Sequence, residues 1–310
     1  MSHSHHHHHS HGHGYHHHSA PASLNRAFAI AVIANFAFTA CQIVFALMAD
    51  SMSLLADAAH NFGDVFGLVL AWGANWLLSL PARQRYSYGF KRTTIIAALI
   101  NALILAATAA VITYESIYKL FHLTVVNAPI VIIVGLIGIV INGSTALLFM
   151  KGSHEDLNIK GAFLHLLGDA LISIGVVVAA ILIVYTKKMW LDPLVGLLIV
   201  SIMLWGTWGL LRDSIRLILD AIPRHIQYPA IKTYLKNISG VKAVHDLHIW
   251  GLSTKEVALT VHLVMPDRTL SDEEYQKINL ELKQQFRIDH ATLQVETGSH
   301  EFACARRETC

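Results

Sequence analysis

Six apolar stretches take up most of the first 219 residues, and they constrain the fold more than any other feature of the sequence. Each is long enough to supply the roughly 20 apolar residues that a helix needs to cross a bilayer. We place the stretches near residues 24–49, 53–80, 93–120, 129–150, 158–186 and 190–210. The sequence therefore predicts an α-helical membrane domain with six transmembrane helices over residues 24–219.

Charged residues divide the chain into two parts. Residues 1–219 contain 12 Lys or Arg and 9 Asp or Glu, whereas residues 220–310 contain 11 and 12 in less than half the length. The overall formal charge is only +2, which excludes a strongly basic nucleic-acid binder. The 3 cysteines are too few and too scattered for a disulfide framework. A soluble domain therefore follows the membrane domain, and no nucleic-acid partner is expected.

Basic residues in the loops predict the orientation of the spans, because Lys and Arg accumulate on the cytoplasmic side. One side has ten of them, and the other side has only Lys119, Lys187 and Lys188. Both termini are therefore expected in the cytoplasm, as an even number of spans requires. The ten are Arg26, Arg83, Arg85, Lys91, Arg92, Lys151, Lys160, Arg212, Arg216 and Arg224.

The chain begins with a histidine-rich segment over residues 1–23, in which residues 3–18 hold 11 of the 21 histidines. The segment has no apolar periodicity, so we expect a disordered cytoplasmic tail. Its composition is typical of loose metal binding. A purification tag is the alternative, but Ser and Gly interrupt the histidines and favour a native tail.

Two of the apolar stretches contain the same polar motif, a histidine followed four residues later by an aspartate. The second stretch has His60 and Asp64, and the fifth has His165 and Asp169. Residues four apart lie on one helical face, and ionisable groups inside a membrane are costly and mark function by default. Packed together, the two helices would bring two nitrogens and two oxygens to one point, a tetrahedral set that suits Zn²⁺. Hydrogen bonds between packed helices are the alternative explanation.

Other polar residues lie within the same stretches. Asp57 and Asn61 share the helical face of His60, so they are candidate accessory ligands in the membrane. Asn101 and Asn142, in the third and fourth stretches, are expected to form hydrogen bonds between helices and not to bind metal.

Residues 220–300 read as helix, strand, strand, helix, strand, followed by a C-terminal tail at 301–310. We expect helices near 228–238 and 271–287 and strands near 241–250, 255–265 and 291–296. Ser271 and Glu274 form a capping-box pattern at the start of the second helix. This αββαβ order predicts a small open sheet with helices on one face, an α+β fold.

The soluble domain also contains candidate metal ligands. His245, His262, His290 and Glu296 lie in or beside the predicted strands, as does His248, and surface or packing roles are equally open for them. His300, Cys304 and Cys310 are weaker candidates because they form no close pair.

With these motifs the sequence resembles the cation diffusion facilitator family, in its bacterial zinc-exporting branch. The resemblance covers the chain after the tail. It is carried by SMSLLADAAHNFGD (51–64), YSYGFKRTTIIAALINALIL (86–105), LNIKGAFLHLLGDALISIGVV (157–177), DPLVGLLIVSIML (192–204), LLRDSIRLILDAIP (210–223) and VHDLHIWGLS (244–253).

The resemblance implies a homodimeric antiporter that exports Zn²⁺ in exchange for protons, located in the bacterial inner (plasma) membrane. It implies that His60, Asp64, His165 and Asp169 bind the metal, and that a ferredoxin-like cytoplasmic domain dimerises and binds regulatory metal. No resident cofactor is implied beyond Zn²⁺ as cargo and regulator. Loop histidines between the second and third spans, which some members have, are absent here.

The chemistry of the motif also favours proton coupling. Free imidazoles have a pKa of about 6.5 and must be neutral to bind metal, so metal binding releases protons. Three other functions remain open: a broader exporter of Zn²⁺, Cd²⁺ and Co²⁺, a membrane metal sensor and an intramembrane metalloenzyme. The enzyme is the least favoured, because the sequence has no HExxH motif and four ligands would close the zinc shell.

Overall fold

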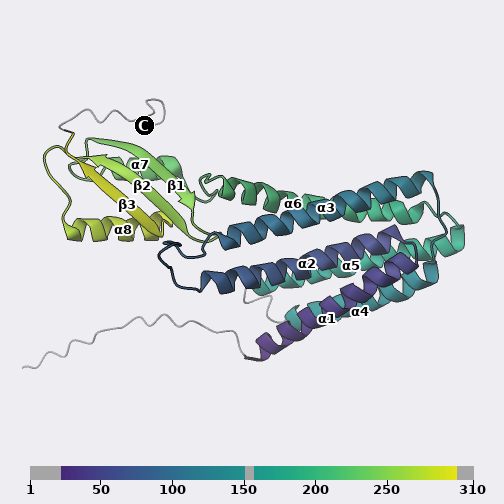
Figure 1. The fold of residues 1–310 in the computed structure, drawn as a ribbon. Helices are drawn as coiled ribbons and strands as arrows, with labels where there is room; N and C mark the ends of the chain where they lie inside the picture. Colours follow the sequence, from purple (N-terminus) through teal and green to yellow (C-terminus); the bar gives the residue numbers. More distant parts are fainter. Residues whose placement is uncertain (1–21, 151–156, 299–310) are drawn as a thin grey trace, which may run out of the picture.

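The computed structural model of the chain describes residues 22–150 and 157–298 (Figure 1). Six long helices lie roughly along one another, and a small domain with a sheet sits at one end of them (Figure 1). The histidine-rich tail before residue 22, the C-terminal tail at 301–310 and the residues His300, Cys304 and Cys310 lie outside the described residues. The elements that are described have the order α1–α7, β1, β2, α8, β3.

The six long helices correspond closely to the six predicted spans. Five of them are long and apolar enough to cross a membrane, and α1 contributes a shorter apolar segment, Ile33–Met48. The bounds are α1 Ala22–Met48, α2 Met52–Leu78, α3 Thr93–Phe121, α4 Ala128–Met150, α5 Leu157–Thr186 and α6 Leu191–Ile218.

The largest difference from the predicted spans is at the end of α6. The predicted span ends at residue 210, but the helix continues to Ile218, beyond its apolar part. No Gly or Pro interrupts residues 210–218, so the helical backbone persists where hydropathy falls. Asp220, with a positive φ of 56°, lies just after its end.

The outer surface of the helical bundle is apolar. Trp72, Phe121, Tyr185 and Trp205 are among many large side chains that are more than half exposed. A water-soluble protein rarely exposes so much contiguous apolar surface. Together with the helix lengths, this surface shows an integral membrane protein.

A buried carboxylate fixes the start of α2 against α6. Asp192, in the first turn of α6, accepts hydrogen bonds from Ser51 Oγ at 2.6 Å, Ser53 Oγ at 2.6 Å and the Met52 backbone N–H at 2.5 Å. A negative charge at a helix N-terminus satisfies free N–H groups and complements the helix dipole. These bonds fix the position of α2 along its axis relative to α6. They therefore also fix the position of its HxxxD motif within the bundle.

The small domain has the predicted αββαβ order. Its elements are α7 Tyr228–Lys236, β1 Ala243–Gly251, β2 Val257–Val264, α8 Asp272–Phe286 and β3 His290–Glu296. The sheet order is β1-β2-β3, with β1 and β2 antiparallel and β2 and β3 parallel. Ser271 and Glu274 form the predicted capping box of α8. The predicted fold class is confirmed for both parts of the chain.

Alternation along β2 separates the two faces of the sheet. Val257, Leu259, Val261 and Leu263 are buried in a core with residues of both helices, among them Ile231, Leu235, Ile278 and Leu282. The intervening residues of β2 point to the opposite face, because successive side chains of a strand alternate. His262 is one of them, and this second face therefore carries the polar residues described below.

The small domain is joined to the membrane domain by polar contacts. Lys91, just before α3, forms an ion pair with Glu256, and the Thr254 backbone N–H donates to Thr94 Oγ1 at 3.1 Å. Arg92, at the start of α3, pairs at 2.7 Å with Asp220, which lies just after the end of α6. These contacts lie where the sheet domain approaches the bundle in Figure 1.

Candidate metal centre

The two HxxxD motifs face each other across α2 and α5. His60 Nε2 lies 3.1 Å from Asp169 Oδ1, and His165 Nε2 lies 3.1 Å from Asp64 Oδ2. Within each helix the histidine and aspartate are 3.8 Å apart on α2 and 3.7 Å apart on α5. The imidazole rings meet edge to face, with centroids 5.9 Å apart. The structure thus brings three of the predicted ligands together, and His165 lies beside two of them.

The arrangement can hold a metal ion. Ligand atoms of His60, Asp64 and Asp169 all lie within 4.8 Å of one another, and His165 lies beside Asp64. Two imidazoles and two carboxylates supply a tetrahedral nitrogen–oxygen set, and the carboxylates balance a divalent charge. Without a metal, opposite partners within 3–4 Å form charge-assisted contacts when the imidazoles are protonated. The same side chains can therefore bind either a metal or protons.

Exposure changes along the site. The Asp169 side chain is only 3% exposed, whereas that of His165 is 48% exposed. Asp64 is also more exposed than His60. Because α2 and α5 are antiparallel, Asp64 and His165 are the members nearer to the sheet domain (Figure 1). The site is therefore more open toward that end of the bundle.

Asp57 and Asn61 do not join the four ligands. Asp57 is fully buried and accepts hydrogen bonds from Gln42 Nε2 of α1 at 2.6 Å and Ser173 Oγ of α5 at 3.1 Å. The Asn61 amide donates to Gln42 Oε1 at 3.2 Å. Sequence reasoning did not identify Gln42, although a glutamine within an apolar stretch is itself a signal.

The expected hydrogen bonds of Asn101 and Asn142 are not found, so that prediction is wrong. Among the described residues neither side-chain atom of the buried Asn142 has a partner, nor does Asn101 Oδ1. The residues that face these two side chains either have no polar side chain or already donate their hydrogen bond elsewhere. The Asn101 amide lies against Gly67, and Ser173, which lies near Gly138 one turn from Asn142, donates its hydroxyl to Asp57.

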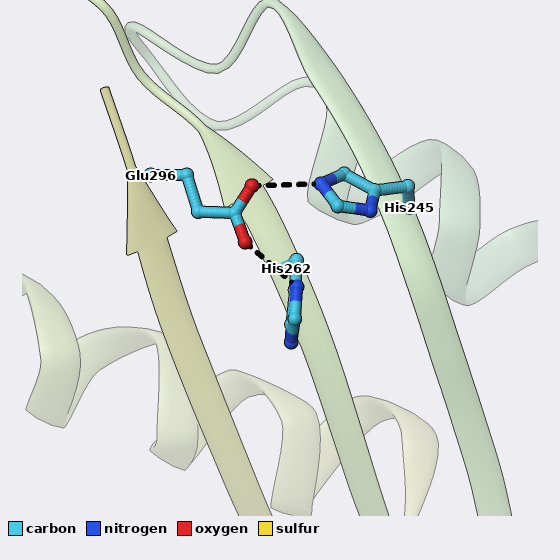
Figure 2. Close-up of side chains that lie close together, drawn as sticks. All are labelled: His245, His262 and Glu296. Atoms are coloured by element: carbon cyan, nitrogen blue, oxygen red, sulfur yellow. Dashed lines mark hydrogen bonds and ion pairs between the residues drawn. The ribbon is translucent and has the colours of Figure 1, made fainter. Parts of the chain in front are cut away.

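A second cluster lies on the face of the sheet opposite the domain core. Glu296 Oε2 is 2.9 Å from His245 Nε2, and Glu296 Oε1 is 2.8 Å from His262 Nδ1 (Figure 2). Figure 2 shows the carboxylate of β3 reaching across to imidazoles of β2 and β1. His245 and His262 are register partners on neighbouring strands. These three residues also form a group whose ligand atoms could hold a metal ion.

His290 is not part of this cluster. It lies at the start of β3, six residues before Glu296, which corresponds to about 20 Å along a strand. Its ring contacts Tyr88, with centroids 5.6 Å apart. His248 is also outside the group; its Nε2 is 2.9 Å from the Asp246 carboxylate, which lies 3.6 Å from His262 Nε2. Of the four residues predicted for a site in this domain, the structure brings together three.

Comparisons with known proteins agree with this architecture. Residues 28–219 match the cation efflux transmembrane domain, and residues 223–298 match the cytoplasmic domain of cation efflux proteins. The cation efflux system protein CzcD of Alcaligenes sp. (strain CT14) is 33% identical over 289 residues, which cover 92% of this chain and 90% of that protein.

Two further relatives are similarly close. The cadmium, cobalt and zinc/H⁺–K⁺ antiporter of Bacillus subtilis (strain 168) is 33% identical over 84% of this chain and 85% of its own. The zinc transporter ZitB of Escherichia coli (strain K12) is 30% identical over 87% and 86%. The two domain matches and these relatives show a transporter of divalent cations and not an enzyme, and the chain belongs to the cation diffusion facilitator family.

Proposed function

We propose that this protein exports Zn²⁺ from the cytoplasm in exchange for protons, by alternating access at the site formed by His60, Asp64, His165 and Asp169. The observation that carries the proposal is the crossed pairing of the two motifs, at 3.1 Å for both His60–Asp169 and His165–Asp64. Neither helix alone supplies a complete metal shell, but the pair supplies four ligands.

The donor set favours zinc among divalent metals. Mg²⁺ and Ca²⁺ prefer shells made of oxygen alone, and Cu⁺ prefers sulfur, which this site lacks. Zn²⁺ accepts imidazole and carboxylate together in tetrahedral geometry. Two carboxylates cancel its charge, which matters where the surrounding dielectric is low.

Proton exchange follows from the same ligands. An imidazole that binds metal cannot carry a proton on the same nitrogen, so metal entry displaces protons and metal release allows them to return. His60 Nε2 and His165 Nε2 each face a carboxylate across the helix pair, which stabilises the protonated form when the metal has left. Protons and metal therefore compete for one site.

The proposal includes location, assembly and direction. We place the protein in a bacterial inner (plasma) membrane, with both termini and the sheet domain in the cytoplasm, as the loop charges favour. The greater exposure of His165 and Asp64, toward the sheet domain, supports entry of the metal from that side. We also propose a homodimer formed through the sheet domain, supported by the match of residues 223–298 to a domain of cation efflux proteins.

We further propose that His245, His262 and Glu296 bind Zn²⁺ as a regulator. Two imidazoles and a carboxylate from three neighbouring strands are already within hydrogen-bonding distance. Three protein ligands leave a fourth position for water or for a group from elsewhere. Because β1 and β3 lie on either side of β2, bound metal would fix the whole sheet.

A broader exporter of Zn²⁺, Cd²⁺ and Co²⁺ is the second candidate. It is supported by the Bacillus subtilis relative, whose name includes all three metals. Affinity order alone does not select among such metals. Competition by Cd²⁺ and Co²⁺ for zinc flux, measured with the same protein, separates the two functions.

The test is zinc flux into liposomes that contain the purified protein and a zinc-sensitive dye. The wild-type protein should transport zinc, and Asp64→Asn and His165→Ala should not. Asp267→Asn changes an exposed carboxylate of the sheet domain and serves as the matched control. Normal flux in the ligand variants would overturn the site assignment, and zinc binding without flux in the wild-type protein would favour a membrane sensor.

A further inference from the structure

Three buried polar side chains beside the metal site are linked by two hydrogen bonds, and two of their oxygens lack a donor. Gln42 Nε2 donates to Asp57 Oδ2 at 2.6 Å, and Asn61 Nδ2 donates to Gln42 Oε1 at 3.2 Å. All three residues are fully buried. The two remaining atoms, Asp57 Oδ1 and Asn61 Oδ1, have no partner among the described residues.

The two unpartnered oxygens belong to residues four apart on α2. Such residues share a helical face, with Cβ atoms about 5–6 Å apart. An ionised aspartate and an amide oxygen are both acceptors, so neither can satisfy the other. Burying both without a donor is unfavourable. One proton on Asp57 Oδ1 would supply a donor between these two residues of one helical face.

The charges near Asp57 favour the same state. Under the function proposed above, two carboxylates already balance the divalent metal. The charged groups that face Asp57 are His60 on its own helix and Asp169 on α5. Its other neighbours are the uncharged Gln42 of α1 and Ser173 of α5. A third ionised carboxylate would leave a net negative charge at membrane depth, which is costly.

We propose that Asp57 is held as a neutral, protonated carboxyl group that positions the metal site and neither binds metal nor exchanges protons. Its Oδ1–H donates to Asn61, and its Oδ2 accepts from Gln42 and Ser173. Asp57 lies one turn before His60 and Ser173 one turn after Asp169. The 3.1 Å contact between Ser173 and Asp57 therefore sets the spacing of α2 and α5 next to the ligands.

The charge argument of this inference rests on the proposed function. The inference predicts different effects for a conservative substitution of Asp57 and for one that truncates its side chain. An amide at position 57 would donate to Asn61 and accept from Gln42 and Ser173, as the neutral acid does. Asp57→Asn should therefore keep zinc flux within about threefold of wild type and leave the protons exchanged per zinc unchanged. Asp57→Ala leaves buried partners unsatisfied and should lower flux more than about tenfold.

Flux and proton exchange are measured in liposomes, with Asp64→Asn as the comparison in which the same chemical change removes a ligand. The inference is overturned if Asp57→Asn loses flux as Asp57→Ala does while remaining folded, or if it changes the number of protons exchanged. Absence of flux in the wild-type protein would instead overturn the proposed function. In that case an infrared measurement, described next, still decides the protonation state of Asp57.

The second measurement is the infrared C=O stretch of a protonated carboxyl group in the purified protein at neutral pH. We expect the band in the wild-type protein and its loss in Asp57→Asn. Asn61→Ala removes the acceptor and should shift the band to higher frequency, so the assignment does not depend on one variant folding. A wild-type protein without the band, or a band that neither substitution changes, would overturn the inference.

Discussion

His165 Nε2 of α5 lies 3.1 Å from Asp64 Oδ2 of α2, and the reverse pair, His60 and Asp169, has the same 3.1 Å separation. Each helix thus places its imidazole against the carboxylate of the other. This crossed pairing makes the site depend on the distance and register between α2 and α5. A small relative movement of the two helices would change all four ligand positions together, which is the kind of movement that the proposed alternating access needs.

Removing a buried ligand should weaken zinc binding strongly. Asp169 is the least exposed of the four, and Asp169→Asn removes a charge that balances the metal. We expect the zinc affinity of the membrane site to fall more than about 100-fold, since losing even an outer partner of a ligand costs 10–100-fold. Calorimetric titration in a His262→Ala background removes the proposed sheet-domain site, and Asp169→Asn is compared with that background, which has the same histidine-rich tail. Asp267→Asn, an exposed change in the sheet domain, is the control and should leave the affinity unchanged.

The sheet cluster should contribute one bound zinc per chain. Glu296 contacts both His245 and His262, so Glu296→Gln removes the charge on which the cluster depends. Equilibrium dialysis of the full chain is expected to show one zinc fewer than in the wild-type protein. Glu273→Gln, an exposed change in α8, should show no loss. Equal zinc content in Glu296→Gln and wild type would refute a metal role for these residues.

The ion pair between Asp50 and Lys119 should make stability depend on pH at the end of the bundle opposite the sheet domain. Partial burial would raise the pKa of Asp50, but hydrogen bonds from Lys119 and Thr124 outweigh it and hold the pKa below its ordinary value. A lowered folded-state pKa stabilises the protein above the unfolded value of about 3.9 and ceases to do so as the pH falls through the folded value.

Lys119→Met should therefore lower the unfolding free energy at pH 7 by about 0.5–1 kcal/mol, a modest effect because Asp50 is half exposed. The difference from wild type should shrink at a pH below the folded-state pKa of Asp50, to the part that comes from the hydrogen bond of Lys119 Nζ to the Asp50 backbone carbonyl. Thermal unfolding in detergent at both pH values measures it. A difference that is the same at both pH values would show that Lys119 acts through packing or this backbone hydrogen bond and not through its ion pair with Asp50.

Asp192 should be among the most important residues for stability. Its carboxylate is buried and accepts from Ser51, Met52 and Ser53 at the start of α2. Asp192→Ala should destabilise the protein by about 3 kcal/mol, because several buried donors lose their acceptor. Ser51→Ala, which removes one cap, should cost about 1 kcal/mol. Equal costs for the two variants in denaturant unfolding would contradict this account.

The sequence predicted the local elements well, because each is encoded by neighbours in the chain. The length of the apolar stretches indicated the six long helices, and Ser271 with Glu274 indicated the start of α8. The end of α6 was misplaced because hydropathy marks where the hydrocarbon ends, whereas backbone propensity decides where the helix ends. The HxxxD spacing indicated one face on each helix, and the structure brings the two faces together.

Relationships between distant residues could not be read from the sequence. Asp192 and Ser51 are 141 residues apart, and nothing local to either indicates the other. In the sequence Gln42 is a single polar residue within an apolar stretch. Its hydrogen bond to Asp57 depends on how α1 packs against α2. His290 was grouped with the other candidate ligands because it lies beside the predicted strands, but which end of a strand faces a site depends on sheet register. Such features depend on packing and register, which single-sequence patterns do not contain.

The central claim is that metal and protons exchange at one intramembrane site. Its most direct test records zinc uptake and internal pH together in liposomes that contain the wild-type protein. Zinc entry should be accompanied by proton exit, and both should be lost together in Asp64→Asn. Zinc entry without any movement of protons would contradict the account, because the four ligands could not then exchange a metal ion for protons.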